Sequence, residues 1–156
     1  MKKIGLTIII LFIALGNLSA RHKKQKTVNS KIQSIYMRRT ACFGKCPDYI
    51  VEISNTGKVK YTGNHFVKDS GVFEKNFSTV NVQRLFDEFT RFQIDTCQAQ
   101  YESRIQDLPG IIYKISYKDR VQSINSANFG PVFLRNLALS VDSFAQVDKS
   151  WKKIRK

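Results

Sequence analysis

Residues 38–49 set the start of the sheet in this chain, and they read Arg38-Arg39-Thr40-Ala41-Cys42-Phe43-Gly44-Lys45-Cys46-Pro47-Asp48-Tyr49. This stretch holds two of the three cysteines in the 156-residue chain. Cys42 and Cys46 are four residues apart. In an extended strand that separation is about 13 Å, which is far beyond disulfide reach. A bond between them therefore requires the chain to curl back, which Gly44 permits, and Pro47 fixes the exit from the curl.

The cysteine pair has three interpretations. A structural disulfide fits an exported chain, because exported thiols are usually oxidised. A redox-active pair is the second, although the usual redox motif has two intervening residues and no helix N-terminus is evident to lower a thiol pKa. A metal site is the third, but His22, His65 and Cys97 have no ligand-like spacing. The sequence favours the structural disulfide and predicts neither a metal ion nor another cofactor.

The cysteine stretch belongs to a longer pattern. The pattern comprises Arg39-x-x-Cys42-x-Gly44-x-Cys46-Pro47-x-Tyr49, a turn at Asn55-Thr56-Gly57, and then Val59-x-Tyr61-x-Gly63. Later pieces are Gly71 after a short strand, Asp107-x-Pro109 before a β-hairpin, and a closing helix with Trp151 just beyond it. Together they resemble DUF6438, a bacterial domain family of unknown function, over roughly residues 32–151, which is most of the mature chain. The resemblance implies a small exported domain, and it brings no catalytic residue or ligand with it.

The N-terminus is typical of a secretory signal peptide. A cationic start, Met1-Lys2-Lys3, precedes an apolar run over residues 4–15, and small residues follow as far as Ala20. The apolar run is too short for a comfortable membrane-spanning helix, which needs about 20 residues. We therefore expect residues 1–20 to be cleaved near Ala20 and the protein to be periplasmic or extracellular. Retention of this segment as an uncleaved anchor is the alternative.

The chain carries a large positive excess. Its formal net charge is +14, and it falls to +12 when residues 1–20, with their two lysines, are removed. Residues 21–31 read as a disordered basic arm, and residues 152–156 read as a basic tail. Such tails either keep the protein soluble or attract an anionic lipid surface, a polysaccharide or nucleic acid. Export argues against nucleic acid as the partner.

Between the tails, residues 32–151 are predicted to form a single domain. Strands are expected at 32–39, 48–54, 58–63, 64–68, 72–77, 111–118 and 120–126, and helices at 79–92 and 131–147. The clearest signal is a hairpin, because apolar residues alternate on both sides of Asn55-Thr56-Gly57. Together these strands and helices predict an α+β fold in which hairpins form an antiparallel β-sheet and the two helices pack on one face.

The two faces of the predicted sheet differ in chemistry. The face that meets the helices would carry Val51, Ile53, Val59, Tyr61, Tyr113 and Ile115. The opposite face would carry Lys58, Lys60, Lys114 and Lys118, with Glu52 as the main counter-charge. These four lysines form a candidate anion-binding surface. Cys97 is expected to be a buried or partly buried thiol, and a bond from Cys97 to Cys42 or Cys46 is the alternative.

Catalytic motifs are absent from the sequence. It contains no Gly-rich phosphate loop, no paired-histidine metal motif and no nucleophile elbow. The favoured hypothesis is an exported, non-enzymatic binding or structural module of the cell envelope. Its partner would be an anionic envelope component, namely a lipid surface or a polysaccharide, or another envelope protein. The alternative is an envelope thiol–disulfide protein in which Cys42 and Cys46 cycle and Cys97 resolves the mixed disulfide.

Overall fold

A computed structural model describes residues 31–104 and 107–155. Its strands and helices are β1 (Ser34–Arg39), β2 (Asp48–Ser54), β3 (Lys58–His65), β4 (Gly71–Asn76), α2 (Thr79–Arg91), β5 (Ile111–Ser116), β6 (Val121–Ile124), α3 (Val132–Phe144) and β7 (Lys152–Arg155). Two short 3-10 helices, η1 (Ile94–Thr96) and η2 (Ala127–Phe129), lie in the connections. The predicted signal peptide, 1–20, and nearly all of the predicted arm, 21–31, lie outside the described residues.

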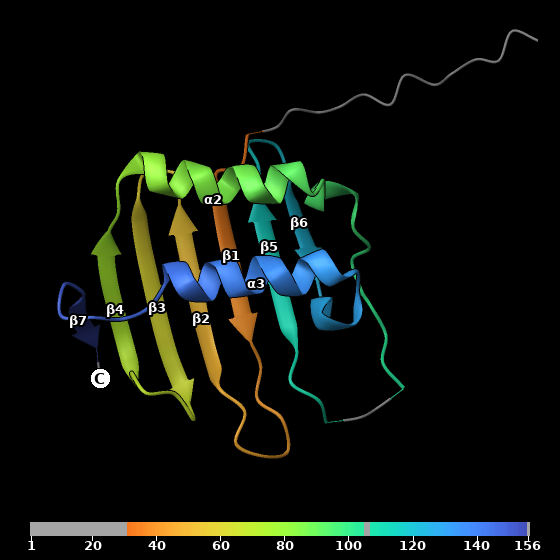
Figure 1. The fold of residues 1–156 in the computed structure, drawn as a ribbon, viewed down its shortest axis with the longest axis horizontal. Coiled ribbons are helices and arrows are strands. Elements are labelled where there is room, and N and C mark those ends of the chain that lie inside the picture. The colour runs from red at the N-terminus through yellow and green to blue at the C-terminus, as the bar shows by residue number, and fades with distance from the viewer. Residues whose placement is uncertain (1–30, 105–106, 156) are drawn as a thin grey trace, which may run out of the picture.

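The strands form one seven-stranded antiparallel sheet in the order β6-β5-β1-β2-β3-β4-β7. Helices α2 and α3 both lie across the same face of this sheet (Figure 1). The predicted α+β fold, with an antiparallel sheet and two helices on one face, is confirmed. The first strand lies near the middle of the sheet, where Met37 is opposite Val51 on one side and Tyr113 on the other. β1 therefore joins the two sets of hairpins.

Local sequence explains the best-predicted elements. Ser78 caps α2, since its hydroxyl accepts a hydrogen bond from the Asn81 N–H at 3.2 Å. The turn between β2 and β3 requires glycine, because Gly57 has a φ of 97° and an added Cβ would lie 2.3 Å from the Phe77 carbonyl oxygen. At the start of α3, Pro131 occupies the N-cap position, where its missing N–H costs nothing.

The core lies between the helices and the sheet, on the predicted face. All six residues assigned to that face are buried: Val51, Ile53, Val59, Tyr61, Tyr113 and Ile115. The apolar stripe of α2 is buried against them. Tyr113 lies at the centre, with its ring edge-on to Phe89 at 5.7 Å between centroids, and its hydroxyl donates to the Leu134 carbonyl oxygen at 2.8 Å. The buried hydroxyl is thus satisfied by the backbone of α3.

Two predictions about the strands are wrong. Residues 64–68 do not form a strand of their own, because β3 continues to His65 and a turn then leads into β4. Residues 152–156 are not simply a solvated tail, since Lys152–Arg155 form β7 and pair with β4. Trp151, just before β7, packs edge-on against Phe77, and Phe77 stacks on Phe144 at the end of α3. The C-terminal segment is therefore part of the fold.

Candidate functional site at the disulfide end of the sheet

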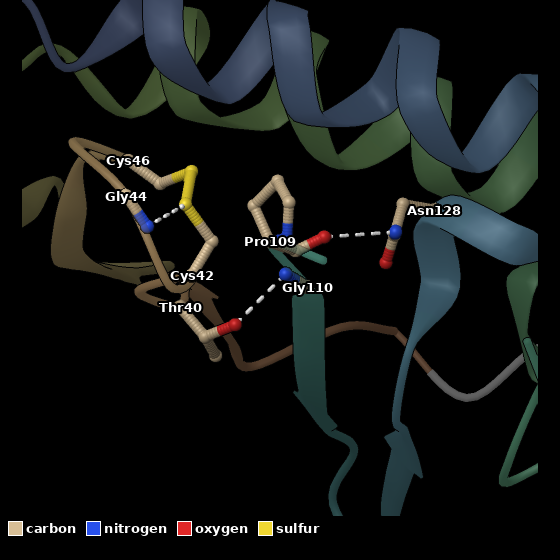
Figure 2. The surroundings of a disulfide bond; sticks show 7 residues. All are labelled: Thr40, Cys42, Gly44, Cys46, Pro109, Gly110 and Asn128. Carbon is tan, nitrogen blue, oxygen red and sulfur yellow. Dashed lines mark hydrogen bonds between the residues drawn. A yellow bond between two sulfur atoms is a disulfide. The ribbon is translucent and has the colours of Figure 1, made fainter. Parts of the chain in front are cut away.

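Cys42 and Cys46 form a disulfide that closes the connection between β1 and β2. Their Cα atoms are 5.5 Å apart, so the chain curls back as a bond between them requires. The Gly44 N–H, at the middle of the loop, points to Cys42 Sγ at 3.3 Å (Figure 2). We call residues 40–47 the disulfide loop. The disulfide joins two residues near the ends of this loop and so fixes its shape covalently.

The disulfide loop is also tied to the segment that leads into β5. The Thr40 N–H donates to the Gly110 carbonyl oxygen at 3.0 Å, and the Gly110 N–H donates to Thr40 Oγ1 at 2.8 Å. Asn128 Nδ2 in η2 donates to the Pro109 carbonyl oxygen at 2.9 Å (Figure 2). The cysteine stretch and the Asp107-x-Pro109 piece, which are far apart in sequence, therefore lie side by side.

Both ends of the cysteine stretch are bonded to one carboxylate on α3. Arg39 and Tyr49 are opposite each other on β1 and β2. Arg39 Nε and Nη2 donate to Asp142 Oδ2 at 3.1 and 2.5 Å, and the Tyr49 hydroxyl donates to Asp142 Oδ1. We call these three residues the Asp142 clamp. It holds the last turn of α3 against the start of the disulfide loop.

The electrostatics of the clamp support a structural role. Asp142 lies in the last turn of α3, where the helix dipole disfavours a negative charge, and Arg39 compensates for it. Burial lowers the pKa of Arg39, but the hydrogen bonds and charge of Asp142 outweigh this and raise it. Burial, together with Asp142, raises the pKa of Tyr49, so its hydroxyl keeps its proton and remains a donor. Sequence reasoning missed Asp142 because nothing in its spacing relates it to Arg39 or Tyr49.

Two large apolar side chains are exposed at this end of the sheet. Phe43, in the disulfide loop, is 93% exposed, and Phe66, between β3 and β4, is 59% exposed. The two loops are neighbours, because Asp48 at the start of β2 is opposite His65 at the end of β3 (Figure 1). An exposed lysine follows each phenylalanine two residues later, Lys45 and Lys68. We call Phe43, Lys45, Phe66 and Lys68 the loop tips.

The predicted lysine surface is partly neutralised. Lys58 forms an ion pair with Glu74 at 3.0 Å, and Lys60 forms one with Glu52. The Lys114 ammonium lies 5.4 Å from the centre of the Tyr36 ring, and Lys118 lies in the turn between β5 and β6.

The positive excess lies mostly outside this surface. Residues 32–148 contain 14 Lys and Arg against 12 Asp and Glu, which leaves a net charge of only +2. Most of the +14 of the whole chain therefore belongs to the two ends of the sequence.

Cys97 is a free, partly buried thiol, and burial raises its pKa. Its carbonyl oxygen accepts from Gln122 Nε2 at 2.9 Å, and Gln122 is opposite Ile115 near the end of β5. The disulfide loop is bonded to Gly110 at the other end of β5. About 17 Å of strand separates the two sites. Cys97 is therefore not placed to resolve a mixed disulfide at Cys42 or Cys46.

Neither a metal centre nor a membrane span is evident in the parts of the chain that the structure describes. Within residues 31–104 and 107–155, no three His, Cys, Asp or Glu side chains are grouped closely enough to hold a metal ion. Across the same ranges, no helix combines the length and the apolar character needed to cross a bilayer.

Replacing both Cys42 and Cys46 with serine is expected to lower the free energy of unfolding by about 2 kcal/mol, because the bond closes a very short ring. Urea unfolding measures the loss, and Cys97→Ser is the control with an intact disulfide. A double variant that cannot fold would contradict this prediction, because it would show that the whole fold depends on the disulfide.

Comparison with known proteins identifies one family. The model of a domain of unknown function (DUF6438) matches residues 33–145. No curated protein and no solved structure matches the chain. The matched range contains the disulfide loop and all three residues of the Asp142 clamp, and it covers well over half of the 156 residues. The chain belongs to the DUF6438 family.

Proposed function

We propose that this protein is an exported, non-enzymatic binding module of the cell envelope that contacts an anionic lipid surface through its loop tips. The observation that carries the proposal is the 93% exposure of Phe43 on a loop closed by a disulfide. Contact with a partner would remove this large apolar surface from water, which is favourable. The loop is held by its own bonds, so little ordering is needed on binding.

Export is supported by the sequence of residues 1–20 and by the disulfide. The cationic start, the short apolar run and the small residues up to Ala20 have the layout of a secretory signal. Disulfides persist in oxidising compartments and are rare in the cytosol. A binding role rather than catalysis is supported by the Asp142 clamp, since the ionisable groups at the ends of the cysteine stretch bond to one another.

A lipid surface fits the chemistry of the loop tips. Aromatic side chains favour the boundary between headgroups and acyl chains, and lysines beside them favour anionic headgroups. Each basic residue near such a surface contributes about 1 kcal/mol. The basic residues 21–31 and 149–156 add long-range attraction, and together they contain 10 Lys and Arg and no Asp or Glu.

Co-sedimentation with vesicles tests this proposal. The protein is expected to bind vesicles of phosphatidylglycerol and phosphatidylcholine at low salt, and to bind pure phosphatidylcholine far more weakly. Phe43→Ser should weaken binding roughly tenfold, because burying a phenylalanine contributes about 1.5 kcal/mol or more. This change removes an exposed side chain and leaves the core intact.

Val80→Ser is the matched control. Val80 is 59% exposed on α2, beside Asn55 in the β2–β3 turn and hence at the opposite end of the sheet. The Val80→Ser variant should bind vesicles as tightly as the unaltered protein does. Equal binding by Phe43→Ser and the unaltered protein would contradict the proposed contact, and no binding at low salt would remove the lipid surface as the partner.

A further inference from the structure

A half-open pocket of about 170 Å³ lies beside the Asp142 clamp, between the end of α3 and the connection from β3 to β4, and we call it the cavity. Its walls include Tyr49, Tyr61, Asp69 and Asp142. Gly63 allows Asp69 to reach this position, because a Cβ at Gly63 would lie 2.1 Å from the Asp69 carbonyl oxygen. The cavity is thus built by close packing of the β3–β4 connection on β3.

The hydroxyl of Tyr61 is available to a ligand in this cavity. The residue is only 9% exposed, and its ring lies between those of Tyr49, at 5.5 Å, and Phe73, at 6.3 Å. Tyr61 lines the cavity, and among the residues that the structure describes none forms a hydrogen bond with its hydroxyl. Burial raises the pKa of Tyr61 to about 12, and the charges of Asp69 and Asp142 add to this. The hydroxyl is therefore neutral, close to both carboxylates and without a protein partner.

The charges around the cavity favour a single cation. Asp142 pairs with the Arg39 guanidinium, whereas Asp69 has no ion-pair partner among the described residues, and the nearby Lys153 ammonium instead donates to the Ser70 carbonyl oxygen at 2.9 Å. The last carbonyl groups of α3 carry partial negative charge, and the last turn of this helix contains no basic side chain.

We propose that this cavity binds a primary alkylammonium group. Such a group has three N–H donors, and the residues that line the cavity include two acceptors for them, the Asp69 carboxylate and the Tyr61 hydroxyl. Val147 supplies an apolar wall for the alkyl part. A water molecule occupies about 30 Å³ of liquid, so the volume suits roughly five non-hydrogen atoms. This is the size of butylammonium.

The inference does not rest on the proposed lipid contact. The loop tips, Phe43, Lys45, Phe66 and Lys68, are not part of the cavity wall. The vesicles named above contain no primary amine, so their result and the amine titration are independent. A free amine and an ethanolamine headgroup present the same chemical group, and the probes below separate them.

Titration of the whole protein with n-butylammonium, followed by NMR or calorimetry, tests the proposal. Saturable binding is expected in the millimolar range, on the order of what a ligand of five heavy atoms can reach. n-Butanol, which has the same shape and no charge, should bind at least about tenfold more weakly. Equal effects of butylammonium and butanol, or no saturable change with either, would overturn the proposal.

Two variants locate the site. Asp69→Asn should weaken butylammonium binding by about tenfold, and Tyr61→Phe should weaken it severalfold with the ring retained. Asp119→Asn is the control, because Asp119 is an exposed carboxylate in the β5–β6 turn. This variant should bind butylammonium as tightly as the unaltered protein does. Equal affinities for the two aspartate variants would place the amine elsewhere and overturn the assignment.

O-Phosphoethanolamine identifies the source of the amine. Tighter binding than butylammonium would indicate an ethanolamine headgroup, and weaker binding would indicate a free alkylamine. Either order supports an ammonium site, provided that Asp69→Asn weakens both.

Discussion

Trp151→Ala is expected to lower the free energy of unfolding by about 3–5 kcal/mol, the usual loss for removing a buried tryptophan. Trp151 is only 7% exposed and packs edge-on against Phe77, with ring centres 5.9 Å apart. The Lys75 ammonium lies 4.8 Å from the centre of the Phe77 ring, and Phe144, at the end of α3, stacks on the same ring with 4.4 Å between centroids. Alanine would leave a cavity where the sheet, α3 and the C-terminal segment meet.

Trp151→Phe is the matched control for this prediction. It keeps an aromatic ring and removes an indole N–H that is buried without a hydrogen-bond partner among the described residues. The expected loss is below about 1.5 kcal/mol, because removing an unpaired polar group offsets part of the lost contact. Guanidinium unfolding of both variants makes the comparison. A loss below 1 kcal/mol for Trp151→Ala, on the order of a surface substitution, would mean that the C-terminal segment is not part of the cooperative fold.

This result bears on where the domain ends. The family match stops at residue 145, whereas Trp151 and β7 follow it and contact the sheet. A chain cut at the end of the match would lose both the tryptophan and the outermost strand. Such a chain should be at least as unstable as Trp151→Ala.

Asp142→Ala is expected to lower the free energy of unfolding by about 2–3 kcal/mol. The change leaves the guanidinium of Arg39 and the hydroxyl of Tyr49 without their shared acceptor. Breaking a fully buried pair costs about 3–5 kcal/mol, and the lower value follows because Arg39 and Asp142 are only partly buried. Thermal or urea unfolding gives the difference.

A double-mutant cycle shows whether the clamp acts as a unit. Arg39→Ala alone should be destabilising, yet it should cost much less in the Asp142→Ala background, where its partner is already gone. Tyr49→Phe removes one hydrogen bond and keeps the ring, so its loss should be about 1 kcal/mol. Losses at Arg39 and Asp142 that simply add would show that the two residues act independently.

Much of the fold could be predicted because its signals are local. The hairpin on either side of Asn55-Thr56-Gly57 and the stripe on α2 follow from the period of the apolar residues, and both are confirmed. The curl between Cys42 and Cys46 follows from bond geometry once the two are paired. In each case the residues that decide the structure are within one element or one turn.

The rest depends on contacts between distant residues. Asp142 lies 93 residues beyond Tyr49, and in the sequence it is one of several polar residues on an amphipathic helix. The lysines of the sheet were predicted to share a face, but their ion pairs with Glu52 and Glu74 depend on which strands are neighbours. Strand β7 was missed because a run of basic residues is typical of a solvated tail.

That run of basic residues has a further consequence at the margin of the sheet. β7 is a short outermost strand, and its Lys152 and Lys153 side chains are exposed. If two copies approached each other along this margin, they would bring like charges together before backbone groups could pair. Charge repulsion therefore disfavours pairing of two copies of the sheet through this edge.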